Sequence, residues 1–152
     1  MVNIDGRQYL ITARHVVQEK AHGKVIQEIK DGDRIEIFFE GAWVPKVVRP
    51  IFAKNEADAV ALAPDSITMP GLDIPLGTAG IALGQKVFFL GLPFSLASRS
   101  RDKNDFIPFV KAGILSAIDY GDKKTPIVYI DGHNNPGFSG GPVLFPNLAK
   151  GR

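Results

Sequence analysis

The stretch DGHNNPGFSGGPV, residues 131–143, concentrates glycine and proline around Ser139. Glycine permits positive φ and close backbone approach, and proline fixes φ and removes an N–H donor, so this density specifies one unusual backbone shape. A tight connection between two strands explains such a pattern in most proteins. In a second interpretation Ser139 is a nucleophile and the neighbouring backbone amides bind a developing oxyanion. The choice depends on partner residues elsewhere in the chain.

The composition is that of one globular domain with a substantial core, since the chain has 152 residues and 45% of them are hydrophobic. Its 18 Lys and Arg and 16 Asp and Glu are interspersed, so charge favours neither a nucleic acid nor an anionic membrane as partner. The lack of cysteine excludes disulfides, thiolate metal sites and a cysteine nucleophile. No apolar run approaches the roughly 20 residues of a membrane span, and the first residues lack a signal-peptide core. The localisation is left open.

Short apolar segments separated by turn residues predict an all-β protein. They are rich in Val, Ile, Phe and Tyr, and none has the stripe of a long amphipathic helix. The expected strands are residues 7–12, 34–39, 43–48, 58–63, 86–91, 109–118, 126–131 and 141–145. One short helix is expected at 13–20, and residues 71–84 are expected to connect two halves with similar numbers of strands. A mostly antiparallel barrel or sandwich follows.

Two residues far from Ser139 are candidates to act with it. His15 lies in the short helix expected just after the strand at 7–12, and such a junction can place an imidazole at the rim of a sheet. Asp58 opens the strand expected at 58–63, where we expect apolar surface to shield its carboxylate from water. A Ser/His/Asp site needs His to take the hydroxyl proton, Asp to hold the imidazole tautomer, and backbone N–H groups at the oxyanion. His15, Asp58 and Ser139 fill these roles.

Two other hydrolase classes fit less well. Residues 137–141 match G-x-S-x-G, the nucleophile elbow of α/β-hydrolases, but there the acid and then the histidine follow the serine, whereas here no histidine follows Ser139. A zinc hydrolase using His15 and His22 is disfavoured because helix-face ligands are spaced by three or four residues, and a third ligand has no obvious source. We therefore expect no metal and no cofactor.

Three motifs in order, YLITARHVV (9–17), DAVAL (58–62) and NPGFSGGPV (135–143), resemble those of chymotrypsin-like (trypsin-fold) serine peptidases, and the last is most similar to the bacterial HtrA-type branch. The resemblance implies one peptidase domain of two six-stranded antiparallel β-barrels, roughly residues 1–70 and 85–152, joined by a linker. It places His15, Asp58 and Ser139 as a catalytic triad in the cleft between the barrels. The amides of Gly137 and Ser139 would form the oxyanion hole.

The resemblance also implies parts of the family fold that this chain does not match. The family's opening strand would be almost wholly missing before Arg7, and residues 146–152 read as a hairpin turn after which the family has two more strands and a terminal helix. Those strands would line the specificity pocket. His133, six residues before Ser139, lies where the family often has a residue at the base of this pocket, so the resemblance implies a role for it in specificity. We expect exposed strand edges to favour self-association, and weak or silent catalysis from the 152-residue chain.

The sequence thus predicts a serine endopeptidase that hydrolyses peptide bonds of polypeptide substrates through an acyl-enzyme. The alternative is a catalytically inactive trypsin-fold binding module. The presence of His15, Asp58 and Ser139 together with the oxyanion glycines favours the enzyme, since a binding module has no need of all of them. The lack of a match to the family's opening strand and to its last two strands favours the binding module.

Overall fold

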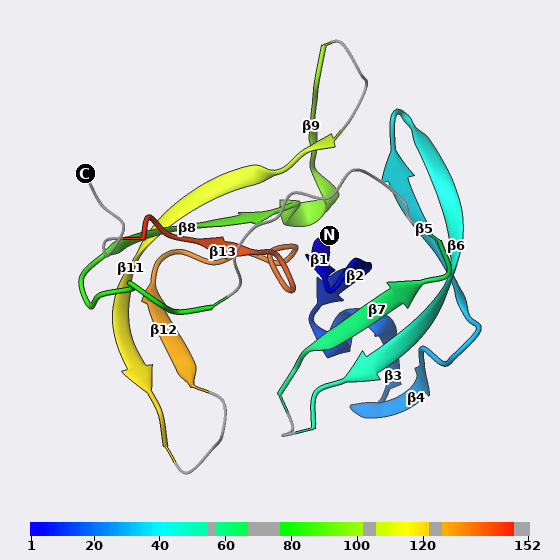
Figure 1. Cartoon of the computed structure of the whole chain (residues 1–152), viewed down its shortest axis with the longest axis horizontal. Helices are drawn as coiled ribbons and strands as arrows, with labels where there is room; N and C mark the ends of the chain where they lie inside the picture. Colours follow the sequence, from blue (N-terminus) through cyan, green and yellow to red (C-terminus); the bar gives the residue numbers. More distant parts are fainter. Residues whose placement is uncertain (55–56, 67–76, 102–105, 122–125, 148–152) are drawn as a thin grey trace. The chain divides into compact units, whose positions relative to one another are not determined.

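The computed structural model describes residues 1–54, 57–66, 77–101, 106–121 and 126–147. The chain divides into two compact units, one formed by Met1–Ile74 with Arg99–Phe106 and the other by Pro75–Ser98 with Ile107–Arg152. The described residues form strands and two short 3-10 helices (Figure 1). The predicted all-β class is therefore confirmed.

The first unit is built on a five-stranded antiparallel sheet with the order β1-β2-β7-β6-β5, and a separate hairpin of β3 and β4 (Figure 1). Its elements are β1 (Val2–Ile4), β2 (Arg7–Thr12), η1 (Arg14–Val17), β3 (Gln18–Ala21), β4 (Lys24–Glu28), β5 (Arg34–Phe39), β6 (Ala42–Phe52) and β7 (Val60–Pro64). β1 pairs with the first half of β2, Arg7–Tyr9, and β7 pairs with the second half, Leu10–Thr12.

Three two-residue turns set the register of the hairpins in this unit. Asp5-Gly6, His22-Gly23 and Glu40-Gly41 each have positive φ at both positions. Such turns match the right-handed twist of the flanking strands. His22, considered above as a metal ligand, is therefore a turn residue of the β3–β4 hairpin.

The core of the first unit lies against the middle of its sheet. Val48, Val60 and Leu62 are at most 2% exposed, and Leu10 and Val17 are among the partly buried side chains that pack on them. Burying one such side chain stabilises the fold by about 1.5–3 kcal/mol. Since Val17 ends η1 and Val60 begins β7, the same core fixes both segments that lead to the site described below.

The helix predicted at 13–20 is shorter than expected. The structure has a 3-10 helix at Arg14–Val17, and Gln18–Ala21 form β3, paired with β4. The sequence of β3, QEKA, has no apolar alternation because the hairpin is largely exposed. The turn at His22-Gly23 therefore determines that this segment forms a hairpin, and the pattern of apolar residues could not predict the hairpin.

The second unit is built on a four-stranded antiparallel sheet with the order β12-β11-β8-β13 (Figure 1). Its elements are β8 (Lys86–Gly91), η2 (Pro93–Ser95), β11 (Phe109–Asp119), β12 (Ile127–Asp131) and β13 (Val143–Leu144). Val87 and Leu115 are fully buried in it. Of the predicted connection, residues 71–76 lie outside the described residues, and residues 77–84 contain no strand.

A short ladder of β9 (Ser98–Arg99) and β10 (Phe106–Ile107) connects β8 and β11 along the chain. The ring of Phe106 packs against Phe38 at a centroid distance of 4.2 Å, and the guanidinium of Arg99 lies 5.0 Å from the Phe106 ring centre. These aromatic contacts explain why Arg99–Phe106 belong to the first unit although their neighbours in sequence belong to the second.

Gly141 allows the chain to enter β13 directly beside β8. A Cβ atom at this position would lie 1.9 Å from the Leu90 carbonyl oxygen, and the Leu90 amide donates to the carbonyl of the next residue, Pro142, at 3.2 Å. Any side chain at Gly141 must therefore push the two segments apart.

We expect Gly141→Ala to destabilise the protein by about 1–3 kcal/mol, because the clash is with backbone and cannot be relieved by a rotamer change. Gly132→Ala in the same loop is the matched control, since its Cβ would meet ordinary contacts of 3.4 Å or more. Urea unfolding of both variants measures the difference. Equal stability of the two variants would contradict the packing described here.

Candidate active site

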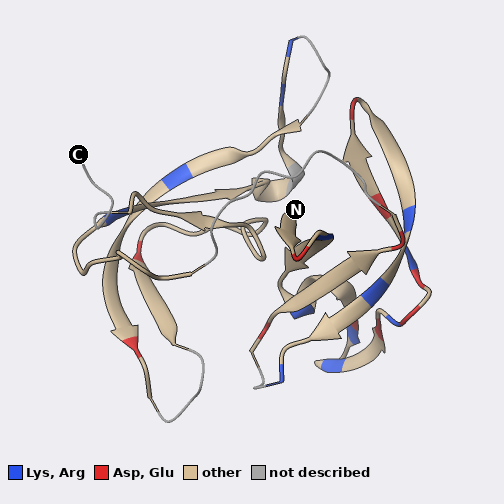
Figure 2. Cartoon of the chain, in the orientation of Figure 1, with Lys and Arg blue, Asp and Glu red and all other residues tan. Residues whose placement is uncertain are grey.

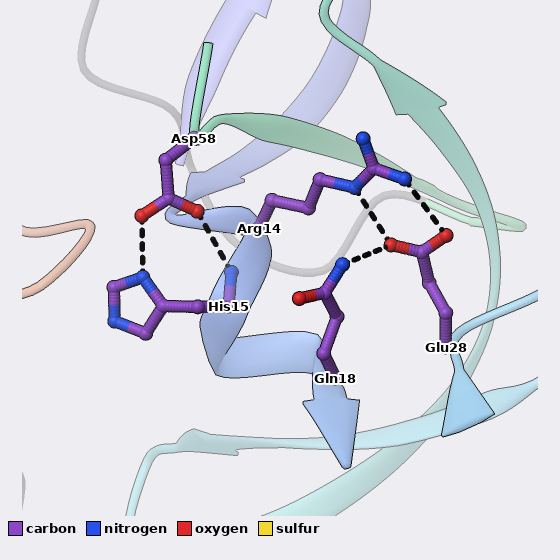
Figure 3. A network of polar contacts seen from close by, with 5 residues as sticks. All are labelled: Arg14, His15, Gln18, Glu28 and Asp58. Atoms are coloured by element: carbon purple, nitrogen blue, oxygen red, sulfur yellow. Dashed lines mark hydrogen bonds and ion pairs between the residues drawn. The ribbon is translucent and has the colours of Figure 1, made fainter. Parts of the chain in front are cut away.

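His15 and Asp58 are held together by two hydrogen bonds in the first unit (Figure 3). The backbone amide of His15 donates to Asp58 Oδ1 at 2.9 Å, and Nδ1 of the imidazole bonds to Asp58 Oδ2. Because a carboxylate is an acceptor, the neutral ring carries its proton on Nδ1 and has Nε2 free to accept one. Nε2 has no hydrogen-bond partner among the described residues. The imidazole is thus oriented as a base.

The register of β2 against β7 explains this contact. Thr12 pairs with Val60, so the chain just after β2 and the chain just before β7 lie side by side. His15 is in η1, the 3-10 turn that follows β2, and Asp58 lies two residues before Val60. Residues 43 positions apart are thereby brought into hydrogen-bond contact.

The expectation that apolar surface shields Asp58 from water is wrong. Its side chain is 57% exposed, and that of His15 is 44% exposed. β7 begins at Val60, so Asp58 precedes the strand and does not take part in the alternation of its faces. Hydrogen bonding, and not burial, defines the environment of this carboxylate.

The hydrogen bond from the His15 side chain lowers the pKa of Asp58 below its ordinary value, and the His15 backbone amide and the charge of Lys20 act in the same direction. Partial desolvation opposes them. The carboxylate therefore stays ionised at neutral pH, where it can hold the Nδ1–H proton and balance a positive charge on the imidazole.

The helical turn that carries His15 is anchored on its other side by Arg14 (Figure 3). Arg14 Nε and Nη2 donate to the two carboxylate oxygens of Glu28 at 2.7 and 3.0 Å, and Gln18 Nε2 donates to Glu28 Oε1 at 2.6 Å. The guanidinium also lies 4.8 Å from the ring centre of Phe52. The hydrogen bond from Arg14 is the main reason that the pKa of Glu28 is lowered. Sequence reasoning missed this network, because the β3–β4 hairpin that supplies Glu28 was not predicted.

Ser139 lies in the second unit, on the loop between β12 and β13, and its side chain is exposed. The loop is held by the segment after β8: the amide of Leu92 donates to the Gly137 carbonyl at 2.9 Å, and that of Phe94 donates to the Pro136 carbonyl at 3.2 Å. Gly137 has a φ of 100°, and a Cβ there would lie 2.2 Å from the Leu92 carbonyl oxygen. Only glycine fits this position.

Phe138 fixes the orientation of its two neighbours. Its side chain is 7% exposed, and its ring packs against Phe89 at a centroid distance of 5.3 Å. With Phe138 turned into the core, Gly137 and Ser139 lie at the surface. Among the described residues, no acceptor takes a hydrogen bond from the amides of these two residues. Two backbone donors beside the Ser139 hydroxyl are therefore available for a negatively charged oxygen.

His133 is exposed at the start of the same loop, and its Nε2 lies 3.3 Å from Asn135 Nδ2. A cavity of about 190 Å³ next to the loop is lined by Phe89, Ile130, Gly132, Asn134, Phe138, Gly141 and Val143. His133 is not among the residues that line it, and its role in specificity stays a prediction.

Among the described residues there is neither a metal-binding cluster nor a membrane-spanning helix. No three side chains of His, Cys, Asp or Glu in these ranges are grouped so that they could hold a metal ion. No helix in the described part of the chain has both the length and the apolar character needed to cross a membrane.

The family model described as trypsin-like peptidase domain matches residues 1–152, and the chain belongs to this family. The predicted family is therefore confirmed, and the all-β fold is the trypsin-like one. No curated protein sequence matches the chain.

Solved structures of HtrA-type proteases are similar to the chain. The protease AlgW with a decapeptide is 22% identical, with a TM-score of 0.60, and the match covers 91% of this chain and 37% of that one. The protease domain of MamO from Magnetospirillum magneticum, in its apo form, is 18% identical, with a TM-score of 0.51 and coverage of 91% and 66%. The chain thus spans little more than a third of the length of AlgW.

We expect His15→Ala to raise the pKa of Asp58 back toward its ordinary range, because the main cause of the lowered pKa is removed. In wild type the folded state holds this pKa below that of the unfolded chain. The contact therefore stabilises the fold above the ordinary carboxyl pKa, and the stabilisation is lost as the pH falls through the folded-state pKa.

Carboxyl-detected NMR titration measures this pKa directly. Glu28 provides the internal control, since Arg14 and Gln18 still bond to it in the variant and its pKa stays low. An Asp58 pKa that does not move in the variant would show that His15 is not the cause.

Proposed function

We propose that the chain is the catalytic part of a serine endopeptidase, in which Ser139 is the nucleophile, His15 the general base and Asp58 the residue that orients the base. The observation that carries the proposal is the pair of hydrogen bonds from His15 to Asp58, which leaves Nε2 as a proton acceptor. Membership of the trypsin-like peptidase family supports it.

In the reaction, Nε2 of His15 takes the proton of the Ser139 hydroxyl as the oxygen attacks the scissile carbonyl. The resulting oxyanion accepts hydrogen bonds from the amides of Gly137 and Ser139, and Asp58 balances the charge of the imidazolium. The imidazolium then gives its proton to the leaving amine, and an acyl-enzyme forms. Water, activated by His15, hydrolyses the acyl-enzyme and regenerates the hydroxyl of Ser139.

Polypeptides are the proposed substrates. The similar AlgW structures contain a decapeptide or a tripeptide, which supports a peptide ligand for a related fold. A peptide carbonyl also suits the backbone amides of Gly137 and Ser139, from which no described acceptor takes a hydrogen bond. The chemistry proposed for the described residues uses no metal and no cofactor.

Fluorophosphonate labelling needs the nucleophile, the base and the oxyanion donors but not the substrate-positioning strands, so we expect the chain to be labelled at Ser139 even though its peptide cleavage is weak. Ser139→Ala should remove the label and lower any peptide cleavage by on the order of 10⁴-fold or more, because no acyl-enzyme can form. Ser116→Ala is the matched control, since Ser116 is an exposed serine of the same unit on β11. Intact-mass measurement after labelling reads the result.

Each other outcome counts against the proposal in a different way. A label that persists in Ser139→Ala would identify another nucleophile. Equal absence of label in wild type and Ser139→Ala would favour the binding module, in which the residues of the site are kept without catalysis.

A further inference from the structure

Lys111 lies on β11 at the position paired with Phe89 of β8. Residues directly opposite each other in an antiparallel pair project their side chains on the same face of the sheet. This is the face on which Phe138 packs, since its ring contacts Phe89. Figure 2 shows that charged residues are sparse in this unit, where those described are Lys86, Lys111, Asp119 and Asp131.

The ammonium group of Lys111 contacts the loop that carries Ser139 at three points. Nζ donates to the His133 carbonyl oxygen at 3.1 Å and to Asn135 Oδ1, and it lies 4.9 Å from the centre of the Phe138 ring. No described carboxylate forms an ion pair with it. An ammonium has three donors and a charge that aromatic faces attract, so these partners satisfy it without an acid.

The first part of this loop has little other support. In the described part of the chain, residues 133–135 make no backbone–backbone hydrogen bond, whereas the carbonyls of Pro136, Gly137 and Pro142 all accept one from the segment Leu90–Phe94. Asn135 Nδ2 continues the chain of contacts from Lys111 to the His133 ring. The side chain of Lys111 thus holds residues 133–135 of the loop in place, and backbone hydrogen bonds hold residues 136–142.

We propose that Lys111 is a positioning residue of the active site, which holds residues 133–138 so that the amides of Gly137 and Ser139 face one oxygen. The proposal rests on the proposed function for its catalytic consequence. Lys111 touches neither substrate nor the reacting atoms, and it acts through the shape of the loop. A backbone amide that stabilises an oxyanion must be positioned to within a few tenths of an ångström. Loosening one side of the loop therefore lowers the rate of reaction at Ser139 without removing any catalytic group.

Three variants separate this role from general packing. Lys111→Met keeps the apolar stem but removes the donors and the charge, and Lys111→Arg restores both. Lys86→Met is the matched control, because Lys86 also places its ammonium near an aromatic ring, 5.4 Å from the centre of Phe88, on the same sheet. No contact of Lys86 with the Ser139 loop is present among the described residues.

The experiment measures the rate of fluorophosphonate labelling of Ser139 and the hydrogen exchange of the loop amides in the whole chain. We expect Lys111→Met to slow labelling by about 10- to 100-fold and to speed exchange in residues 133–139, with exchange in β8 and β11 unchanged. Lys111→Arg should recover most of the labelling rate, and Lys86→Met should behave as wild type.

Unchanged loop exchange in Lys111→Met would overturn the proposal, and so would an equal loss of labelling in Lys86→Met. If wild type itself takes no label, the proposed peptidase function fails. Loop exchange then still decides whether Lys111 holds the loop.

Discussion

The hydrogen bonds between His15 and Asp58 depend on one feature of the first unit, the pairing of Thr12 with Val60 between β2 and β7. Without this register, Asp58 would be an ordinary exposed carboxylate two residues before a strand. With it, the carboxylate meets both the backbone amide and the ring of His15. The buried side chains of Val60 and Leu62 fix the register, because a slip of one residue would turn them to the opposite face of the sheet.

The proposed oxyanion hole makes a different demand on the second unit, since it needs backbone amides from which no acceptor among the described residues takes a hydrogen bond. The carbonyls of Pro136 and Gly137 accept hydrogen bonds from the segment after β8, and the Phe138 side chain is held in the core. The amides on either side of Phe138 are then left at the surface. This arrangement requires glycine at 137, where a Cβ would meet the Leu92 carbonyl, and the approach of the loop to β8 requires glycine at 141, where a Cβ would meet the Leu90 carbonyl.

Sequence reasoning succeeded where an element has its own signal. The strands at 7–12, 34–39 and 86–91 have the predicted bounds because they are apolar segments between turn residues. It failed for β3 and β4, which are largely exposed and have no apolar pattern, and for the exposure of Asp58, which depends on where β7 begins. The contacts of Arg14 with Glu28 and of Lys111 with the Ser139 loop arise only from strand pairing. No local pattern of the sequence could reveal them.

The most direct test of the account is a crystal structure of the chain with a peptide aldehyde, which traps a tetrahedral adduct on an active serine. The account predicts a covalent bond to Ser139 Oγ. The adduct oxygen should lie about 2.7–3.1 Å from the amides of both Gly137 and Ser139, and His15 Nε2 should be within hydrogen-bond reach of the adduct. A well-ordered structure in which His15 Nε2 lies more than about 8 Å from Ser139 Oγ, far outside hydrogen-bond reach, would contradict it.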